Sequence, residues 1–560
     1  MPPALRRVRP FIAAGLLPLL ACGPSVGTSI SPAPSGATAS EITPADLRIR
    51  LSAYADDSMQ GRRSGTPGNV KATDLIAAEA RRLGLEPAGE NGGWFQTVPI
   101  VRRTLVAGAG LTVDGTTYKA WDDLIPRDQG KGTRTIEGAV AVYGGTWDQD
   151  LIAPEQAQGK LVVVSFPPVN GVPAGSVNRA QTTARFPTAA GIVIATLDHV
   201  GPSERLDLQD APAQLAGGDG PEAPAFLYAT GRVVQALLGG PPASLQPGAT
   251  GKTVAGTVAF GDEPVSHPAR NVVAILRGSD PALMGEMVAI GAHNDHDGIS
   301  PEILDHDSLR AFNRLMRPEG ANSTPGEPTA EQSARIKAIL DSLRRVRPAR
   351  RDSVLNGADD DGSGTVGLLE LAEYFVKAKA RPKRSLLFVW HTGEEMGLVG
   401  SNWFTRHPTV PRDSIVAQLN IDMIGRGGAT DIENGGPGYL QLIGSRRLSS
   451  ELGALVDTAN VQGKHGFTFD YQYDADGHPA NYYCRSDHYM YARFGIPIAF
   501  FTTGSHLDYH QLTDEVQYID FDKVANVTSL VADVATRVAD LDHRIMVDKP
   551  KPDPEGVCKQ

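Results

Sequence analysis

The sequence predicts an α/β protein with a three-layer helix–sheet–helix domain, a mostly parallel central sheet and an inserted β-rich domain. From residue 271 onward, apolar runs typical of buried strands alternate with helical patterns, which favours strand–helix–strand units. Residues 105–262 differ, because they hold short strand-like runs between Gly- and Pro-rich loops. The 560 residues also exceed what one compact core holds, so more than one domain is expected.

The N-terminus is predicted to be a targeting segment. Three arginines precede the apolar run Phe11 to Ala21, which is too short to span a bilayer. This run ends in Leu19-Leu20-Ala21-Cys22, which resembles a bacterial lipobox. Residues 1–22 therefore predict a lipoprotein anchored to a bacterial membrane through Cys22, and a plain secretory signal is the alternative.

A flexible linker is expected between the targeting segment and the folded chain. Residues 23–43 are rich in Ser, Pro, Ala, Gly and Thr and cannot bury enough apolar surface to fold. The predicted location is therefore outside the cytoplasm, in the bacterial cell envelope as a lipoprotein, or periplasmic or secreted.

Residues 44–104 predict the first part of the main domain. Thr43-Pro44-Ala45-Asp46 is a helix start signal, with Pro at a first-turn position. A second helix is expected from Asn69 to Leu83, ending at Gly84.

Residues 263–545 predict the rest of this domain, and residues 546–560 a C-terminal tail. Strands are expected at 271–276, 287–291, 385–390, 415–419 and 497–501, and helices at 364–378 and 524–541. The charged stretch 300–355 interrupts the alternation and contains a helical pattern at 331–345. We interpret it as an insertion over the face that carries the polar strand ends.

Charge and cysteine content narrow the function classes. The net charge is −11, so the chain lacks the excess of basic residues that binds nucleic acid, and no nucleic-acid partner is expected. Cys484 and Cys558 remain if Cys22 is lipidated, either as a disulfide or as two free thiols. Cysteine ligation of zinc is not supported, because the chain has no C-x-x-C motif.

Candidate metal ligands follow the predicted strands. His293 follows the strand at 287–291, Glu394 and Glu395 follow 385–390, and Asp422 follows 415–419. His510 comes after the strand at 497–501, and Asp359-Asp360-Asp361 precedes the helix at 364. Open α/β sheets carry their functional residues at the carboxyl ends of the strands, so we expect these groups to meet at one edge.

Such a convergence of carboxylates predicts a bound divalent cation. Carboxylates gathered in one cleft repel each other, and a cation removes that repulsion. Imidazole nitrogen with carboxylate oxygen suits zinc or a similar first-row metal, and histidine argues against calcium. Each motif alone has an ordinary explanation, such as a surface pair or an acidic turn at a helix N-terminus. Together, in this order and at strand ends, they favour a metal site.

The motifs resemble the co-catalytic zinc aminopeptidases, a family that includes bacterial leucyl-type enzymes and is related to glutamate carboxypeptidase and glutaminyl cyclase. The matching segments are Gly291-Ala292-His293-Asn294-Asp295, Gly357 to Gly364, Gly393 to Leu398, Asn420-Ile421-Asp422-Met423, Ser486-Asp487-His488 and Asp508-Tyr509-His510. The resemblance covers roughly residues 44–104 and 263–545. The β-rich insert at 105–262 resembles a protease-associated domain.

The resemblance implies two zinc ions per chain and a set of metal ligands. His293 and Asp422 would hold one ion, Glu395 and His510 the other, and Asp360 would bridge them. A cis peptide is implied after Asp360.

The resemblance also assigns roles around the ligands. Glu394 would be the general base and Tyr509 would stabilise the oxyanion. Asp295 would accept a hydrogen bond from His293, and Asp487 and His488 would support the site or serve the structure. His296 and Asp297 have no assigned role and are interpreted as loop residues near the site.

The implied activity is a zinc-dependent exopeptidase that releases N-terminal amino acids from peptide substrates. A carboxypeptidase of the glutamate carboxypeptidase type is an alternative, and Arg485 is a candidate for binding the substrate α-carboxylate. A one-zinc glutaminyl cyclase is a weaker alternative, because all five ligands and the base are retained. A non-catalytic, receptor-like protein of this fold is an alternative from a different class.

Overall fold

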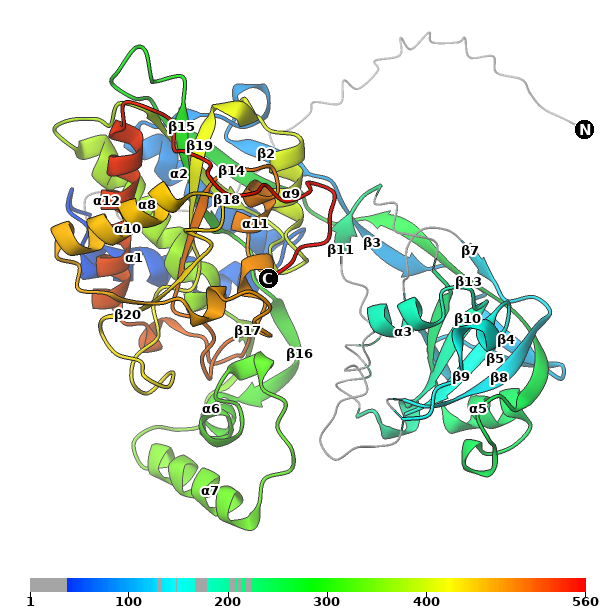
Figure 1. Ribbon diagram of the computed structural model, residues 1–560. Coiled ribbons are helices and arrows are strands. Elements are labelled where there is room, and N and C mark those ends of the chain that lie inside the picture. Colours follow the sequence, from blue (N-terminus) through cyan, green and yellow to red (C-terminus); the bar gives the residue numbers. More distant parts are fainter. Residues whose placement is uncertain are drawn as a thin grey trace, which may run out of the picture. The chain divides into compact units, whose positions relative to one another are not determined.

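A computed structural model describes residues 38–127, 133–147, 149–166, 179–201, 205, 208, 213–217 and 223–560 (Figure 1). The targeting segment predicted at 1–22, with Cys22, and most of the predicted linker lie outside the described residues. In the described part of the chain, no helix combines the length and the apolar character that crossing a bilayer requires.

The main sheet has nine strands, and polar strand ends meet at its carboxyl edge. The strand order is β1 (Glu86–Pro87), β14 (Ala269–Leu276), β18 (Ser385–His391), β15 (Met287–His293), β19 (Ile415–Ile421), β22 (Ile498–Thr502), β20 (Tyr439–Ile443) and β21 (Thr468–Asp470), with β2 (Phe95–Val98) also pairing with β14. The four central strands, β18, β15, β19 and β22, run parallel to one another.

The edges of this sheet differ from a purely parallel arrangement. Strand β14 runs antiparallel to β18, and β20 runs antiparallel to β22. A parallel neighbour needs a long crossover, usually a helix. The ten residues 277–286 that leave β14 form only turns, so they supply no such crossover.

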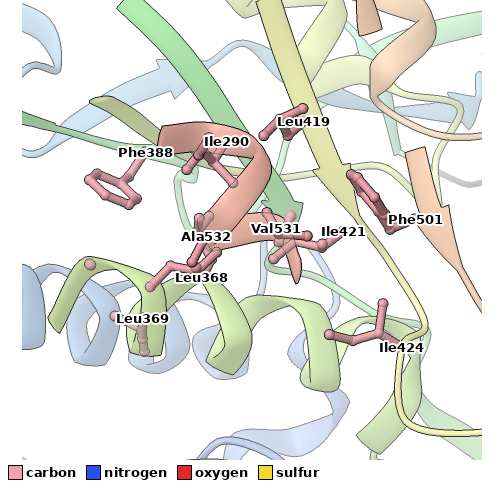
Figure 2. Close-up of a cluster of buried hydrophobic side chains, with 14 of the residues drawn as sticks. Ile290, Leu368, Leu369, Phe388, Leu419, Ile421, Ile424, Phe501, Val531 and Ala532 are labelled. Carbon is pink, nitrogen blue, oxygen red and sulfur yellow. The ribbon is translucent and has the colours of Figure 1, made fainter. Parts of the chain in front are cut away.

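Helices cover both faces of the sheet, which gives the three layers. One face packs on α1 (Pro44–Tyr54), α2 (Pro67–Leu83), α8 (Gly364–Lys377), α10 (Ser450–Gly463) and α12 (Phe521–Asp540), and the other on α9 (Val399–Arg406) and α11 (His488–Ala492). Side chains alternate along each strand, so Ile290 joins the first core and Ala289 the second. Figure 2 shows Ile290 and Leu419 of the sheet packed with Leu368 of α8 and Val531 of α12.

Local signals explain the ends of the predicted helices. The Thr43 hydroxyl accepts a hydrogen bond from the Asp46 amide at 3.1 Å, and Pro44 occupies the first turn of α1. Helix α2 ends at Gly84, which adopts a left-handed conformation with φ 82°. Helix α9, which the sequence analysis does not predict, is only eight residues long and buries Phe404.

The β-rich region forms a second sheet of eleven strands. Its path runs β11 (Ala213–Leu215), β3 (Ile100–Leu105), β13 (Thr250–Pro264), β8 (Ala139–Thr146), β9 (Leu161–Ser165), β10 (Gly191–Ala195), β12 (Ala225–Ala229) and β6 (Leu124–Arg127), joined by β4 (Gly110–Val113), β5 (Thr116–Lys119) and β7 (Thr133–Thr135). Helices α3 (Arg179–Arg185) and α5 (Gly231–Leu238) belong to the same region. The protease-associated assignment of residues 105–262 stays a prediction.

The stretch 300–355 has its own secondary structure. It contains α6 (His306–Met316) and α7 (Ala330–Arg344), and its ends are joined where β16 (Gly298–Asp305) pairs antiparallel with β17 (Arg351–Leu355). Only α7 was predicted. Arg310 of α6 forms an ion pair with Asp508, and Arg350 forms one with Glu515. The insertion therefore contacts the loop that carries His510.

A disulfide joins Cys484 to Cys558 across a Cα–Cα distance of 5.8 Å. Of the two states considered for these cysteines, the structure has the bonded one. The bond ties the C-terminal tail to the segment that precedes α11.

Candidate active site

The five predicted metal ligands come together at the carboxyl edge of the main sheet. His293 is the last residue of β15, Glu395 lies four residues beyond β18, and Asp422 directly follows β19. Asp360 lies just before α8, and His510 lies in the loop after β22. The parallel order of β18, β15, β19 and β22 explains this meeting, because parallel strands end at the same edge.

The two carboxylate oxygens of Asp360 face two different histidines. Its Oδ1 lies 3.0 Å from His293 Nε2, and its Oδ2 lies 3.0 Å from His510 Nε2. His293 Nε2 is also 3.5 Å from Asp422 Oδ1, and His510 Nε2 is 3.1 Å from Glu395 Oε2. The arrangement is thus two groups of three ligands that share Asp360.

These separations fit ligands that surround a metal ion. Zinc binds N and O ligands at about 2.0–2.1 Å, so two ligand atoms of a tetrahedral site lie about 3.3 Å apart. The His293 Nε2 and Asp422 Oδ1 atoms are buried and have no hydrogen-bond partner in the described part of the chain. Buried polar atoms without a partner are costly, and a metal ion would satisfy both.

The electrostatics of the site also favour a cation. Burial disfavours protonation of His293, but Asp422 and neighbouring carboxylates outweigh it and hold its pKa well above the usual range. Burial raises the pKa of Asp360, but His293 and His510 outweigh this effect and hold that pKa well below the usual range. Burial, reinforced by nearby carboxylates and opposed in part by His293, raises the pKa of Glu394 well above the usual range. The raised pKa values of His293 and Glu394 indicate bound protons, whose positive charge a cation would replace.

Backbone amides and buried carboxylates hold the ligands in place. Asp361 accepts hydrogen bonds from the His293 amide at 2.9 Å and the Met423 amide at 3.3 Å, so it links two strand ends. Asp514 accepts from the Asp360 amide at 3.1 Å. The peptide bond between Asp360 and Asp361 is cis, as the family resemblance implies.

The residues predicted to support the ligands take different positions. Asp295 lies beside His293, but the closer acceptor for His293 Nδ1 is the Asp295 carbonyl oxygen at 3.2 Å, with the carboxylate at 3.7 Å. The Asp295 carboxylate instead accepts from the Glu394 amide at 3.2 Å. Burial raises the pKa of Asp487 to about 7. His488 stacks on Phe500 with ring centroids 4.6 Å apart, and burial lowers its pKa to about 3.

Three residues with no predicted role contact the ligands directly. His296 Nδ1 lies 2.7 Å from Glu395 Oε1, and Asp297 Oδ2 lies 2.8 Å from His510 Nδ1. Ser486 donates a hydrogen bond to Asp422 Oδ2 at 2.7 Å. His296 and Asp297 follow His293 by three and four residues, and this closeness in sequence was the available signal.

A pocket opens beside the ligands and brings the two predicted catalytic residues together. Its lining includes Glu394, Tyr509, Arg485, Asp360 and Asp422. The Tyr509 hydroxyl accepts a hydrogen bond from Arg485 Nη2 at 3.0 Å, which leaves its own proton free to donate. The pocket therefore has a carboxylate and a hydroxyl group next to the candidate metal ligands.

Residues 271–535 match the model of peptidase family M28. Residues 271–535 are called the M28 domain below, after the family whose model they match. The match contains all five candidate ligands and both predicted catalytic residues, whereas the β-rich region lies outside it.

Several curated proteins are similar to the M28 domain. Leucine aminopeptidase 1 of Aspergillus fumigatus is 29% identical over 196 residues, which cover 33% of this chain and 47% of that protein. Leupeptin-inactivating enzyme 1 of Streptomyces exfoliatus is 29% identical over 169 residues, covering 30% and 33%. Aminopeptidase Y of Saccharomyces cerevisiae is 29% identical over 211 residues, covering 34% and 35%. The chain thus spans a third to a half of the length of these relatives.

Among solved structures, an aminopeptidase from Aneurinibacillus sp. strain AM-1 aligns with 91% of this chain and 97% of its own, at 16% identity and a TM-score of 0.49.

Proposed function

We propose that this protein is a zinc-dependent exopeptidase that releases N-terminal amino acids from peptides, with two zinc ions per chain. The observation that carries the proposal is the position of Asp360, whose two carboxylate oxygens lie 3.0 Å from His293 Nε2 and His510 Nε2. An aminopeptidase is supported by similarity to relatives named leucine aminopeptidase 1 and aminopeptidase Y.

In this proposal the ligands divide as the distances suggest. His293 and Asp422 would hold one ion, Glu395 and His510 the other, and Asp360 both. Bound zinc would polarise the scissile carbonyl and lower the pKa of the attacking water. The protein's part is to bind the peptide, orient it and move protons.

Glu394 is proposed as the general base. It lines the pocket and neighbours the ligand Glu395, so one carboxylate can hold metal while the other faces the water. Glu394 would take a proton from the attacking water and deliver it to the leaving amine. The Tyr509 hydroxyl would donate a hydrogen bond to the oxygen that becomes negative in the transition state.

A carboxypeptidase is the second candidate, and one observation favours it. Among the residues that line the pocket, Arg485 is the one with a positive charge, and its guanidinium can bind a substrate carboxylate. A receptor-like protein without activity is the third, and it predicts no turnover with any peptide.

Hydrolysis of a substrate panel tests these candidates. The panel pairs aminoacyl substrates that have free N-termini with the same substrates acetylated, each measured with and without a chelator. The proposal expects cleavage of the free series only, lost with chelator and restored by zinc. Cleavage of N-blocked peptides from the C-terminus would favour the carboxypeptidase instead.

Export, with a lipid anchor at Cys22 or a plain secretory signal, is proposed from the sequence of residues 1–22. Labelling with a fatty acid distinguishes the two, because Cys22→Ser would abolish labelling of a lipoprotein and leave a secreted protein unchanged.

A further inference from the structure

Beside the acidic ligands, the pocket has a second group of polar residues. Tyr482, Arg485 and Ser505 all line it. The Tyr482 hydroxyl lies 2.8 Å from Ser505 Oγ, and the Arg485 guanidinium packs 5.4 Å from the Tyr482 ring centre. These three residues and Asn322 are called the Arg485 cluster below.

Asn322 joins this cluster from the insertion at 300–355. Its Nδ2 donates to Ser505 Oγ at 2.7 Å, and its Oδ1 accepts from Arg485 Nη2 at 3.4 Å. The adjacent Ala321 amide donates to the Tyr509 carbonyl at 3.0 Å. The insertion therefore contacts two residues that line the pocket, Arg485 and Tyr509.

Arg485 shares the pocket with Glu394 but forms no direct ion pair with an acid of the described residues. Its hydrogen bonds go to neutral oxygens, namely the Ala480 carbonyl at 3.3 Å, the Asn322 amide and the Tyr509 hydroxyl. Within the described residues no carboxylate oxygen lies within 4.0 Å of its nitrogens, whereas Arg310 and Arg426 each pair with Asp508. The side chain is exposed, so a ligand in the pocket can reach it.

We propose that the Arg485 cluster recognises a carboxylate of the peptide substrate, and that Asn322 makes the insertion a determinant of specificity. A guanidinium offers paired N–H donors that match the two oxygens of a carboxylate, and hydroxyl and amide groups beside it can complete the hydrogen bonds. The carboxylate is either an acidic side chain or the α-carboxylate of the residue after the scissile bond. This inference rests on the proposed function.

Two matched substrate pairs distinguish these sources. Glutamyl- and glutaminyl-p-nitroanilide differ only in a side-chain carboxylate, and Leu-Ala and Leu-Ala-amide differ only in an α-carboxylate. With zinc-loaded full-length protein, we expect kcat/KM for the acid to exceed that for the amide by about 10-fold or more in one of the pairs.

Variants test whether the cluster causes this preference. Arg485→Met should bring the acid-to-amide ratio to about one, mostly through KM of the acid. Asn322→Asp should also lower the ratio, because its carboxylate would pair with Arg485. Arg277→Met is the matched control: Arg277 pairs with Glu86 beyond the end of β14, at the opposite edge of the sheet, so the ratio should not change.

The outcomes separate this inference from the proposed function. Equal or faster cleavage of the amide in both pairs overturns the inference and leaves the peptidase proposal intact. A preference for the acid that survives in both Arg485→Met and Asn322→Asp also overturns it. No zinc-dependent cleavage of any member would defeat the proposed function and the inference together.

Discussion

Replacing Gly320 by alanine tests whether the insertion positions the loop that carries Tyr509 and His510. Gly320 lies in the insertion with φ 54°, in contact with that loop. A Cβ built there would lie 2.3 Å from the Tyr509 carbonyl oxygen and 2.8 Å from the His506 carbonyl oxygen. Both atoms belong to the main chain, so a side-chain rotation cannot relieve the contact.

The size of the effect follows from these distances. Cβ atoms essentially never come closer than 3.0 Å to other heavy atoms, so the two segments must separate by about 0.7 Å, the difference between 3.0 and 2.3 Å. A left-handed conformation costs an alanine roughly 1–2 kcal/mol in addition. Misplacing catalytic groups by about 1 Å can cost about 100-fold in rate, so we expect kcat/KM to fall about 10- to 100-fold.

Steady-state kinetics with a zinc-dependent substrate, together with thermal unfolding, measures the effect. Gly326→Ala is the matched control, because it changes a glycine of the same insertion whose Cβ would meet no atom within 4 Å. It should keep the activity of the unaltered protein. Activity of Gly320→Ala within about twofold of that control would refute the reasoning, because the loop would then not depend on its contact with the insertion.

Three further predictions concern stability and metal binding. Because burial lowers the pKa of His488 to about 3, the unfolded state binds more protons than the folded state between about pH 6.5 and pH 3, so stability falls as the pH falls. His488→Phe should therefore remove a loss of about 1.4 kcal/mol of unfolding free energy per pH unit in this window. Urea unfolding at pH 7 and pH 4.5 measures this loss. The prediction is contradicted if the unfolding free energy falls as much between these pH values in the variant as in the unaltered protein. Cys558→Ser should lower the free energy of unfolding by about 2–4 kcal/mol, because it removes the disulfide. It should also raise KM for peptide substrates, because the disulfide and Gln560 hold the segment before α11 that carries Tyr482 and Arg485. A variant as stable as the unaltered protein under oxidising conditions would contradict this prediction. Asp360→Asn should weaken zinc binding at both positions, and titration that finds one position unaffected would contradict a bridging role.

The sequence predicted the site better than its surroundings, for a physical reason. His293, Glu395 and Asp422 directly follow or lie close to buried strands, so the rule that parallel strands end at one edge placed them together without any coordinates. The order of the motifs then supplied the role of Asp360 by resemblance, and the distances to the two histidines agree with it.

Contacts that depend on long loops could not be predicted. His510 and Asp297 meet although they lie more than 200 residues apart, and Asn322 reaches Ser505 from an insertion whose path has no sequence signal. The antiparallel direction of β14 could not be predicted either, because an apolar run fits a parallel or an antiparallel strand equally well. Helix α9 is only eight residues long, shorter than the window over which a helical pattern is recognised.

The metal content of the purified protein tests the central claim most directly. Elemental analysis after zinc loading and removal of excess metal should find two zinc ions per chain, both in the unaltered protein and in Glu394→Gln, which keeps all five ligands and the side-chain shape but lacks the base. Hydrolysis should be lost in Glu394→Gln alone. Fewer than about one zinc per chain, or unchanged turnover in a fully loaded Glu394→Gln variant, would contradict the account.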